Sequence, residues 1–572
     1  MIAAVVVFAA LVVSTEEASY GLVTDGQSML STACALSRFG ELSISRDFPV
    51  GVKQRKGELE SRYGLGLPLF ETVPMTLSRV ARALRPGFPT LPLFVLLPMV
   101  CLAVAAGGLA RAAEATGLSR GLAIASGVTL ILATPLWGYP ASDLSEPLLA
   151  ACVAVVLAGV CLQRTSGAES VLVAVSTGVA AGLVLLTKPP LVVAVVPLLL
   201  LVSGRSRRWA WGAFAVLAAL WASCELIRFG TLFGGYGQEG FTHPLLDGLL
   251  RLTVFPNKGI LVYAPALLLA FPGMRRLWSE DRPLLLALLA FTGTVFAIAA
   301  TWWAWDGQSG WGPRLVVPAL PALVLIAAHG LPSSRWGRLV SAALVVVGVA
   351  VNCVGALVNY PAIYALVYSA REVDGRAGDS LMARTPGWSP VRLHKALLLE
   401  KIDGGDVASR LATVGLRGIA PPLVASAPLP PLVTGPFRWP IWGRAFGTAL
   451  AGSVDPYDLS LQDQAVRALD TGRLQRASRL ASDMLGRDGD SPAVAALGAE
   501  AEHRAGRPNE AARFLSRAAG SCHAWIVYVR IEAGGDADCL PIQDREPFRA
   551  LAMQGLTRGL TVSTWARAAG SQ

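Results

Sequence analysis

Charge is the scarcest property of this sequence. Only 15% of the 572 residues are Asp, Glu, Lys or Arg, whereas a soluble domain carries about 25%. Apolar residues make up 53% of the chain, and the mean hydropathy is +0.52. They form unbroken runs of helix length, without the regularly spaced polar positions of soluble proteins. This composition excludes a soluble globular protein and predicts a chain embedded in a bilayer.

Motifs of several functional classes are also missing. There is no Walker A motif, so the usual phosphate-binding loop for a nucleotide is not expected. The eight cysteines include no Cys-x-x-Cys, and the five histidines show no ligand spacing, so a metal site is not expected. The first residues lack a basic n-region and a small-residue cleavage site, and no secretory leader is expected.

The basic residues are spread along the chain and do not gather in one patch. The formal charge is +10, yet many arginines stand in short connections between apolar runs. The positive-inside rule produces this pattern, so the charge indicates membrane topology and not a nucleic-acid partner. These arginines are Arg111, Arg120, Arg164, Arg205, Arg207, Arg208, Arg275, Arg276, Arg282, Arg335 and Arg338.

Eleven apolar runs predict membrane-spanning helices. They lie near residues 2–23, 89–110, 120–137, 144–162, 168–186, 189–204, 209–229, 258–274, 283–301, 314–331 and 336–358. The first is cleanly apolar only over residues 2–13, about 18 Å of helix against a hydrocarbon core of about 30 Å. Either this helix continues through Glu16 and Glu17, or the true start lies upstream of Met1. The fifth and sixth runs, joined at Lys188, are expected to form a tight, partly re-entrant hairpin.

The arginine-bearing connections set the predicted orientation. With a cytoplasmic N-terminus, all of them fall inside, as the positive-inside rule requires. Eleven spans then leave everything after Tyr360 outside. The expected fold class is all-α: a multi-pass protein of the plasma (inner) membrane, with about eleven helices over residues 1–358 and an extracytoplasmic C-terminal domain.

The predicted outward regions are the first loop, residues 23–88, the connections 138–143, 230–257 and 302–313, and the tail. The first loop is expected to carry short amphipathic helices. Residues 359–455 are rich in Pro, Gly and Trp and predict an irregular segment at the membrane interface. In residues 456–572, Gly472-Arg473 recurs as Gly506-Arg507 after 34 residues, the period of the tetratricopeptide repeat. Such a domain usually binds a partner or docks on its own protein.

Four motifs fall in order in the outward connections. Asp25 follows the first span and precedes an amphipathic segment. Next comes Tyr63-Gly64-Leu65-Gly66-Leu67-Pro68, then the acidic pair Asp143 and Glu146 at the start of the fourth span. Last comes Trp311-Gly312-Pro313-Arg314, before the Pro-rich tenth span. Together these motifs resemble those of the GT-C superfamily of membrane glycosyltransferases, close to the polyprenyl-phosphate-sugar branch that includes protein mannosyltransferases and the aminoarabinose transferase of lipid A. The resemblance covers roughly residues 1–360.

This resemblance implies transfer of one sugar from a polyprenyl-phosphate carrier to a hydroxyl acceptor on the outer face, with inversion. It implies that Asp25 is the base that takes the proton from the acceptor. The lipid phosphate leaves without a general acid and needs cations to hold it. No cofactor is expected besides the lipid-linked donor. The candidate residues for binding the phosphate or the substrate are Arg314, Lys188, Arg62, Lys56, Tyr63, Asp143, Glu146 and Trp305.

The acidic candidates and Arg314 differ in how well an ordinary structural role explains them. Asp25 is also a good helix N-cap, and Asp143 with Glu146 is also a favourable first-turn charge pair. Arg314 stands on the side that disfavours positive charge, which favours a functional role.

The remaining candidates have structural alternatives too. Lys188 could simply extend to the interface, Lys56 could belong to a solvated face or contact headgroups, and Trp305 could belong to an aromatic belt. Cys522 and Cys539 could form a disulfide if the tail faces an oxidising compartment, or remain free thiols.

Two other functions compete with glycosyl transfer. A lipid-linked sugar transporter or flippase has a similar number of spans, but two related halves and a polar site at the midplane are expected of it. Neither is seen in this sequence. A non-catalytic envelope assembly protein would act through its repeat tail. The sugar and the acceptor, whether glycolipid, polysaccharide or protein, stay open.

Overall fold

The computed structural model describes residues 1–14, 24–44, 51–53, 58–85, 88–140, 142–165, 170–236, 239–308, 310–358, 360, 382–402, 456–488 and 492–517. The chain divides into two compact units. The first comprises Met1–Gly26, Tyr63–Phe70 and Pro92–Gly452. The second comprises Gln27–Arg62, Glu71–Leu91 and Ser453–Gln572.

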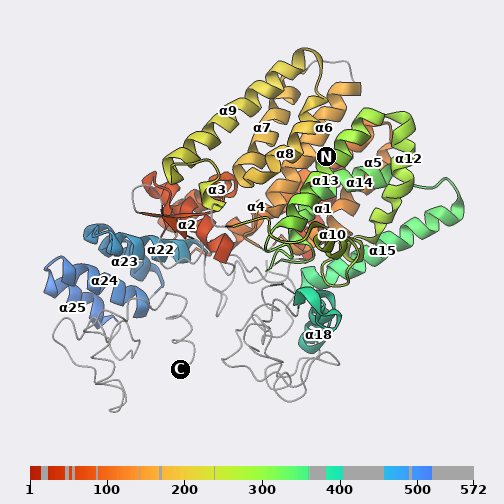
Figure 1. The fold of residues 1–572 in the computed structure, drawn as a ribbon. Coiled ribbons are helices and arrows are strands. Elements are labelled where there is room, and N and C mark those ends of the chain that lie inside the picture. Colours follow the sequence, from red (N-terminus) through yellow and green to blue (C-terminus); the bar gives the residue numbers. More distant parts are fainter. Residues whose placement is uncertain are drawn as a thin grey trace. The chain divides into compact units, whose positions relative to one another are not determined.

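The first unit is built from helices. They are α1 (Ile2–Ser14), the start of α2 (Thr24–Phe39), the start of α3 (Gly66–Leu84), α4 (Leu91–Ala115), α5 (Arg120–Leu132), η1 (Pro135–Gly138), α6 (Glu146–Thr165), α7 (Val171–Thr187), η2 (Pro189–Leu191), α8 (Val192–Leu200), α9 (Gly204–Phe229), η3 (Gly234–Tyr236), α10 (Leu245–Thr253), α11 (Ile260–Tyr263), η4 (Pro265–Leu269), α12 (Ala270–Glu280), α13 (Arg282–Thr301), η5 (Arg314–Ala319), α14 (Leu320–His329), α15 (Arg335–Leu357), η7 (Pro386–Trp388) and α18 (Pro390–Ile402). Figure 1 shows α6, α7 and α9 side by side.

Among the described residues, five helices are long and apolar enough to cross a membrane: α4, α6, α9, α13 and α15. The interior of the unit includes α6, because 89% of its apolar window is buried, against 22% for α9 and for α15. The apolar side chains that α9 and α15 leave exposed would be costly in water and suit contact with lipid. The chain is therefore a multi-pass, mostly helical membrane protein, as its composition predicts.

Five shorter apolar helices lie in other predicted runs: Ile2–Ser14, Arg120–Leu132, Val171–Thr187, Pro189–Leu200 and Arg314–His329. The count of eleven spans stays a prediction. The run at 258–274 differs from the prediction. It is divided among α11, η4 and the first part of α12. Pro265 explains the break, because proline has no backbone N–H and its ring clashes with the carbonyl four residues before it.

Connections predicted to share one side of the membrane contact each other. Arg164 at the end of α6 donates to Asp281 over 2.7 Å, and the Asp281 side chain also accepts from the backbone N–H of Leu284, capping α13. A second contact of this kind joins Nε2 of His329 and Oγ1 of Thr116, which lie 3.0 Å apart. The 20 residues of α6 rise about 30 Å, so this end of the helix lies far from Glu146 at the other end. Which side of the membrane these connections face stays a prediction.

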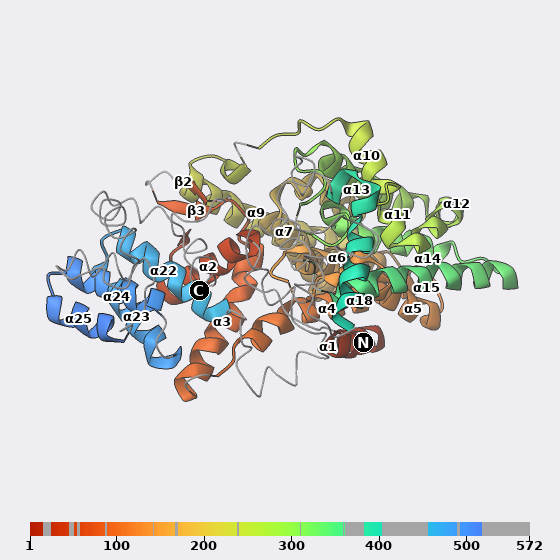
Figure 2. The ribbon, with the colours of Figure 1, turned by 90° about the horizontal axis from the view of Figure 1, so that it is seen from below.

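The second unit combines the first loop with the tail (Figures 1 and 2). Its elements are the rest of α2 and α3, β1 (Ser43–Ile44), β2 (Gly51–Lys53), β3 (Leu59–Ser61), α22 (Pro456–Asp470), α23 (Leu474–Asp488), α24 (Pro492–Arg504) and α25 (Pro508–Ser516). The strands form an antiparallel sheet in the order β1-β3-β2, with Ser43 opposite Glu60 and Gly51 opposite Ser61.

The tail helices form two similar helix pairs. Gly472 and Gly506 adopt φ values of +73° and +72° in the turns between the paired helices, a conformation that favours glycine. After each glycine, the backbone N–H of an arginine bonds back across the turn, from Arg473 to Ala468 and from Arg507 to Glu502. The 34-residue period is therefore a repeat of structure as well as of sequence. Assignment to the tetratricopeptide family stays a prediction.

Ion pairs join the first loop to the tail inside the second unit. Glu41 accepts from Arg467 and Arg473, each over 2.6 Å, and from Arg476 over 3.2 Å. Burial alone would raise the pKa of Glu41, but the hydrogen bonds from Arg467 and Arg476 outweigh it and lower the pKa to about 2. Arg82 of α3 pairs in the same way with Asp458 of α22.

Candidate active site

Asp25 lies in the first turn of α2, and each of its two carboxylate oxygens accepts a hydrogen bond from a residue of another motif. The Tyr63 hydroxyl donates to Oδ1 over 2.6 Å, and Nη2 of Arg314 donates to Oδ2 over 2.9 Å. The Asp25 side chain is 23% exposed, so part of the carboxylate can be reached from outside the fold. The three residues belong to three of the predicted motifs and come together in the first unit.

Glu146 stands at the start of α6 and binds two cations. Its Oε1 accepts from Nε of Arg314 over 3.0 Å and from Nζ of Lys188 over 3.2 Å. The Glu146 side chain is fully buried, and a buried carboxylate is stable only when it is paired. Arg314 therefore bridges Glu146 and Asp25, and Lys188 extends the cationic side of the cluster.

Asp143 lies directly against the backbone beside Asp25. A Cβ added to Gly26 would lie 1.9 Å from Cγ of Asp143, so only glycine fits at position 26. Asp143 is fully buried. The two acidic residues of the fourth span therefore have different surroundings: Glu146 contacts the cations, and Asp143 packs against the start of α2.

The glycines of the Tyr63–Pro68 motif allow a close approach to the end of α7. A Cβ on Gly64 would lie 2.2 Å from the carbonyl oxygen of Leu186, and one on Gly66 would lie 1.9 Å from Oγ1 of Thr187. Any larger residue would push the two segments apart. This packing holds Tyr63 within reach of Asp25, next to the segment that carries Lys188.

Sequence reasoning missed Lys258, which is fully buried and organises the loop before Arg314. Its Nζ donates to the carbonyl oxygens of Gln308, Gly310 and Gly312 over 3.2–3.3 Å. Gly310 lies so close to Arg314 that an added Cβ would stand 2.8 Å from the Cβ of the arginine. The available signal was a lone lysine beside a connection predicted to face outward, where positive charge is disfavoured, the reasoning applied to Arg314.

Trp311 anchors the same loop in the interior. Its Nε1 donates to Asn352 Oδ1 over 2.9 Å, and its backbone oxygen accepts from the Tyr139 hydroxyl over 2.7 Å. Gly138 and Gly355 lie against its ring, where an added Cβ would come within 2.7 Å and 2.2 Å of ring carbons. The Trp-Gly-Pro-Arg motif is therefore a fixed turn that places Arg314.

The other predicted residues have different surroundings. Trp305 stacks on His243 with ring centroids 5.3 Å apart, and Arg251 lies over its ring. Arg62 belongs to the second unit. The roles predicted for Trp305 and Arg62 stay predictions. Lys56, Cys522 and Cys539 lie outside the described residues.

The cluster contains two cations that could bind an anionic group, and a carboxylate, that of Asp25, that could accept a proton. Arg314 uses two of its five N–H groups in the bonds named above, and Lys188 uses one of three. Within the described part of the chain, no group of three or more His, Cys, Asp or Glu could hold a metal ion. Whether a metal takes part stays an untested expectation.

Comparison with known proteins gives two similar folds. No family model matches the chain, and no curated protein gives a significant match. The crystal structure of ArnT from Cupriavidus metallidurans in the apo state is 16% identical, and the match covers 82% of this chain and 78% of that one, with a TM-score of 0.39. The crystal structure of the Archaeoglobus fulgidus oligosaccharyltransferase in the apo form is 10% identical, covering 67% of this chain and 59% of that one, with a TM-score of 0.37.

Proposed function

We propose that this protein is a membrane glycosyltransferase that moves one sugar from a polyprenyl-phosphate carrier to a hydroxyl group of an envelope acceptor, on the outer face of the membrane. The proposal depends on one contact above all. Asp25 and Arg314, 289 positions apart in the sequence, meet over 2.9 Å, with the Tyr63 hydroxyl on the other carboxylate oxygen. A base and a phosphate-binding cation thus stand side by side.

Asp25 has the geometry of a general base. Tyr63 and Arg314 fix the carboxylate plane, each through one of its two oxygens. In the proposed step, the acceptor oxygen bonds to the anomeric carbon and gives its proton to Asp25. The bond from that carbon to the phosphate oxygen breaks, and its electron pair stays on the lipid phosphate. A single displacement of this kind inverts the anomeric carbon.

Arg314 and Lys188 are proposed to hold the departing phosphate. Both cations donate to Oε1 of Glu146, which fixes their positions before any substrate binds. Their remaining N–H groups suit phosphate oxygens, and the guanidinium can bind two oxygens at once. Negative charge develops on the leaving phosphate in the transition state, where fixed cations are most effective. Glu146 is therefore a positioning residue and does not contact the reacting atoms.

Mass spectrometry of carrier lipids and envelope glycans tests this function in cells. Cells that lack the protein are complemented with the wild type, Asp25→Asn or Asp281→Asn. Asp281 is a matched control, because it also starts a helix, accepts from an arginine and is partly exposed, at the other end of α6. We expect sugar-loaded carrier to accumulate beside a glycan that lacks one residue only with Asp25→Asn. Full complementation by Asp25→Asn would favour a transporter or an assembly protein instead.

A further inference from the structure

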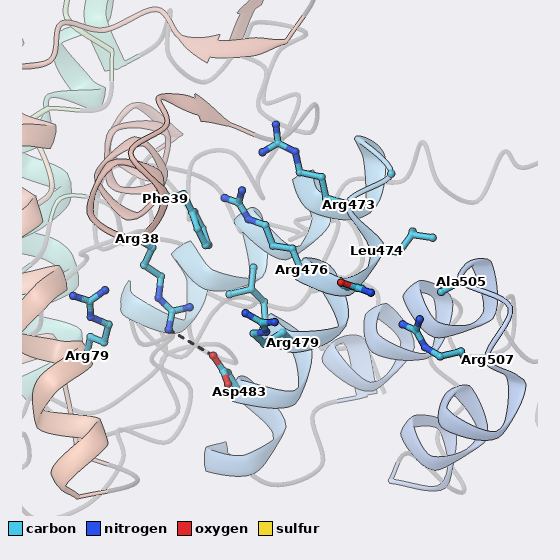
Figure 3. A pocket seen from close by; sticks show the side chains of 13 residues that line it. Arg38, Phe39, Arg79, Arg473, Leu474, Arg476, Arg479, Asp483, Ala505 and Arg507 are labelled. Carbon is cyan, nitrogen blue, oxygen red and sulfur yellow. Dashed lines mark ion pairs between the residues drawn. The ribbon is translucent and has the colours of Figure 1, made fainter.

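The second unit contains a cavity of about 770 Å³ that no proposed catalytic residue lines. Its walls come from the ends of α2 and α3 of the first loop and from α23 and the two glycine turns of the tail (Figure 3). Its volume lies within the range of about 300–1,000 Å³ that is usual for small-molecule sites. Six arginines line it: Arg38, Arg79, Arg473, Arg476, Arg479 and Arg507.

Four of these arginines have acidic partners. Arg38 pairs with Asp483, which also lines the cavity, over 3.6 Å (Figure 3). Arg473 and Arg476 bind Glu41, and Arg507 binds Glu502. The pairs of Arg38, Arg473 and Arg476 join the first loop to the tail, and the pair of Arg507 lies within the tail.

Arg79 and Arg479 differ from the other four. Both are exposed, and neither has an ion pair with a residue in the described part of the chain. Arg79 comes from α3 and Arg479 from α23, so the two sequence-distant halves of the unit each supply one. Because no described acidic residue offsets their charge, these two guanidinium groups favour the approach of an anion to the cavity.

The cavity also has apolar wall surface. Phe39 is partly exposed and carries the guanidinium of Arg476 over its ring, 3.2 Å from the centroid. Leu474 and Leu480 of α23 lie nearby in the same lining. An apolar wall surface beside several cations suits a ligand that has both a ring face and anionic groups.

We propose that this cavity binds an acidic glycan, that is, an oligosaccharide bearing carboxylate or phosphate groups, and holds it as the acceptor of the transfer. Arginine binds both groups in a bidentate geometry. A membrane surface is the poorer fit, because anionic lipid headgroups are met by cations on an open face, whereas these arginines line a recess together with Phe39 and Leu474. The assignment of the glycan as the acceptor rests on the proposed function, and the binding itself does not.

Direct binding tests the site on the full-length protein in detergent. The probes are fluorescently labelled tetragalacturonate, its neutral counterpart maltotetraose, inorganic pyrophosphate, and vesicles containing phosphatidylglycerol. The test variant is Arg79→Gln/Arg479→Gln. The control is Arg85→Gln/Arg517→Gln, which removes the same charge from two exposed arginines of the same unit outside the cavity.

We expect tetragalacturonate to bind with a Kd that rises at least tenfold in the test variant and stays within about twofold in the control, because charge-assisted hydrogen bonds are lost only in the former. Maltotetraose is expected not to bind. Competition by pyrophosphate would show that the same arginines bind phosphate groups, and would support an anion site in the cavity. An equal loss in both variants, equal binding of maltotetraose, or binding to the vesicles without binding to tetragalacturonate would overturn the proposal.

Transfer assays keep the two proposals apart. Asp25→Asn should abolish transfer and leave the Kd for tetragalacturonate unchanged. The Arg79→Gln/Arg479→Gln variant should raise KM for an acidic acceptor and leave kcat unchanged. If Asp25→Asn stays active, the proposed function fails while the binding site stands; if the double variant keeps both Kd and KM, the site fails while the enzyme stands.

Discussion

Replacing Arg314 by lysine separates the charge of this residue from its geometry. The guanidinium reaches Asp25 through Nη2 over 2.9 Å and Glu146 through Nε over 3.0 Å. A single ammonium group cannot take both places, so one charge-assisted hydrogen bond is lost, which costs about 1.5–3 kcal/mol. At about 1.36 kcal/mol per tenfold in rate, kcat/KM should fall about 10- to 150-fold.

The stability of the variant should change much less than its activity. Lysine keeps the positive charge, so the buried Glu146 keeps a cationic partner besides Lys188. Arg314→Gln removes the charge and should cost about 3–5 kcal/mol of stability, because it breaks a buried ion pair.

The assay measures kcat/KM with a synthetic polyprenyl-phosphate sugar and thermal unfolding on the same reconstituted samples. Wild-type activity in Arg314→Lys would refute the bridging role. So would equal losses of stability in the two variants.

Three further predictions concern the surroundings of the site and the second unit. Gly66→Ala places a Cβ 1.9 Å from Oγ1 of Thr187 and should lower the free energy of unfolding by about 1–3 kcal/mol; Gly121→Ala, with nothing within 4 Å, should not, and thermal unfolding compares them. Lys258→Met leaves three carbonyl oxygens without their shared donor and should speed hydrogen exchange over residues 307–313, whereas unchanged exchange would exclude a role in the loop. Glu41→Gln should destabilise the second unit at neutral pH; because the pKa is lowered from 4.5 to about 2 in the folded state, the difference from wild type should persist above about pH 4.5 and vanish as the pH falls to about 2, and a pH-independent difference would contradict this.

Several residues of the candidate site could be picked out because charged residues are rare at the ends of apolar runs in this chain. In a chain with so few charges, Asp25, Glu146, Lys188 and Arg314 stand at the ends of apolar runs on one predicted side. The structure brings all four together, along with Tyr63 from the glycine motif. Their predicted side of the membrane and their order along the chain made them candidates. Neither feature indicates that Arg314 bridges two carboxylates.

The parts that could not be predicted depend on contacts between distant segments. Lys258 has no motif around it, and its role appears only in the three-dimensional contacts with the carbonyl oxygens of Gln308, Gly310 and Gly312. The joining of the first loop with the tail depends on pairs such as Glu41 with Arg467, which are 426 residues apart. The break at Pro265 was missed because the run at 258–274 was identified from its apolar residues alone, which do not show whether a helix is continuous.

The rate of sugar transfer by purified Asp25→Asn in lipid nanodiscs tests the central claim most directly. The donor is a polyprenyl-phosphate sugar, and its binding is measured on the same sample. We predict that transfer falls about 10²- to 10⁴-fold, that the Kd of the donor stays within about twofold, and that Asp281→Asn transfers at the wild-type rate. Transfer by Asp25→Asn at the wild-type rate would contradict the assignment of this residue as the base.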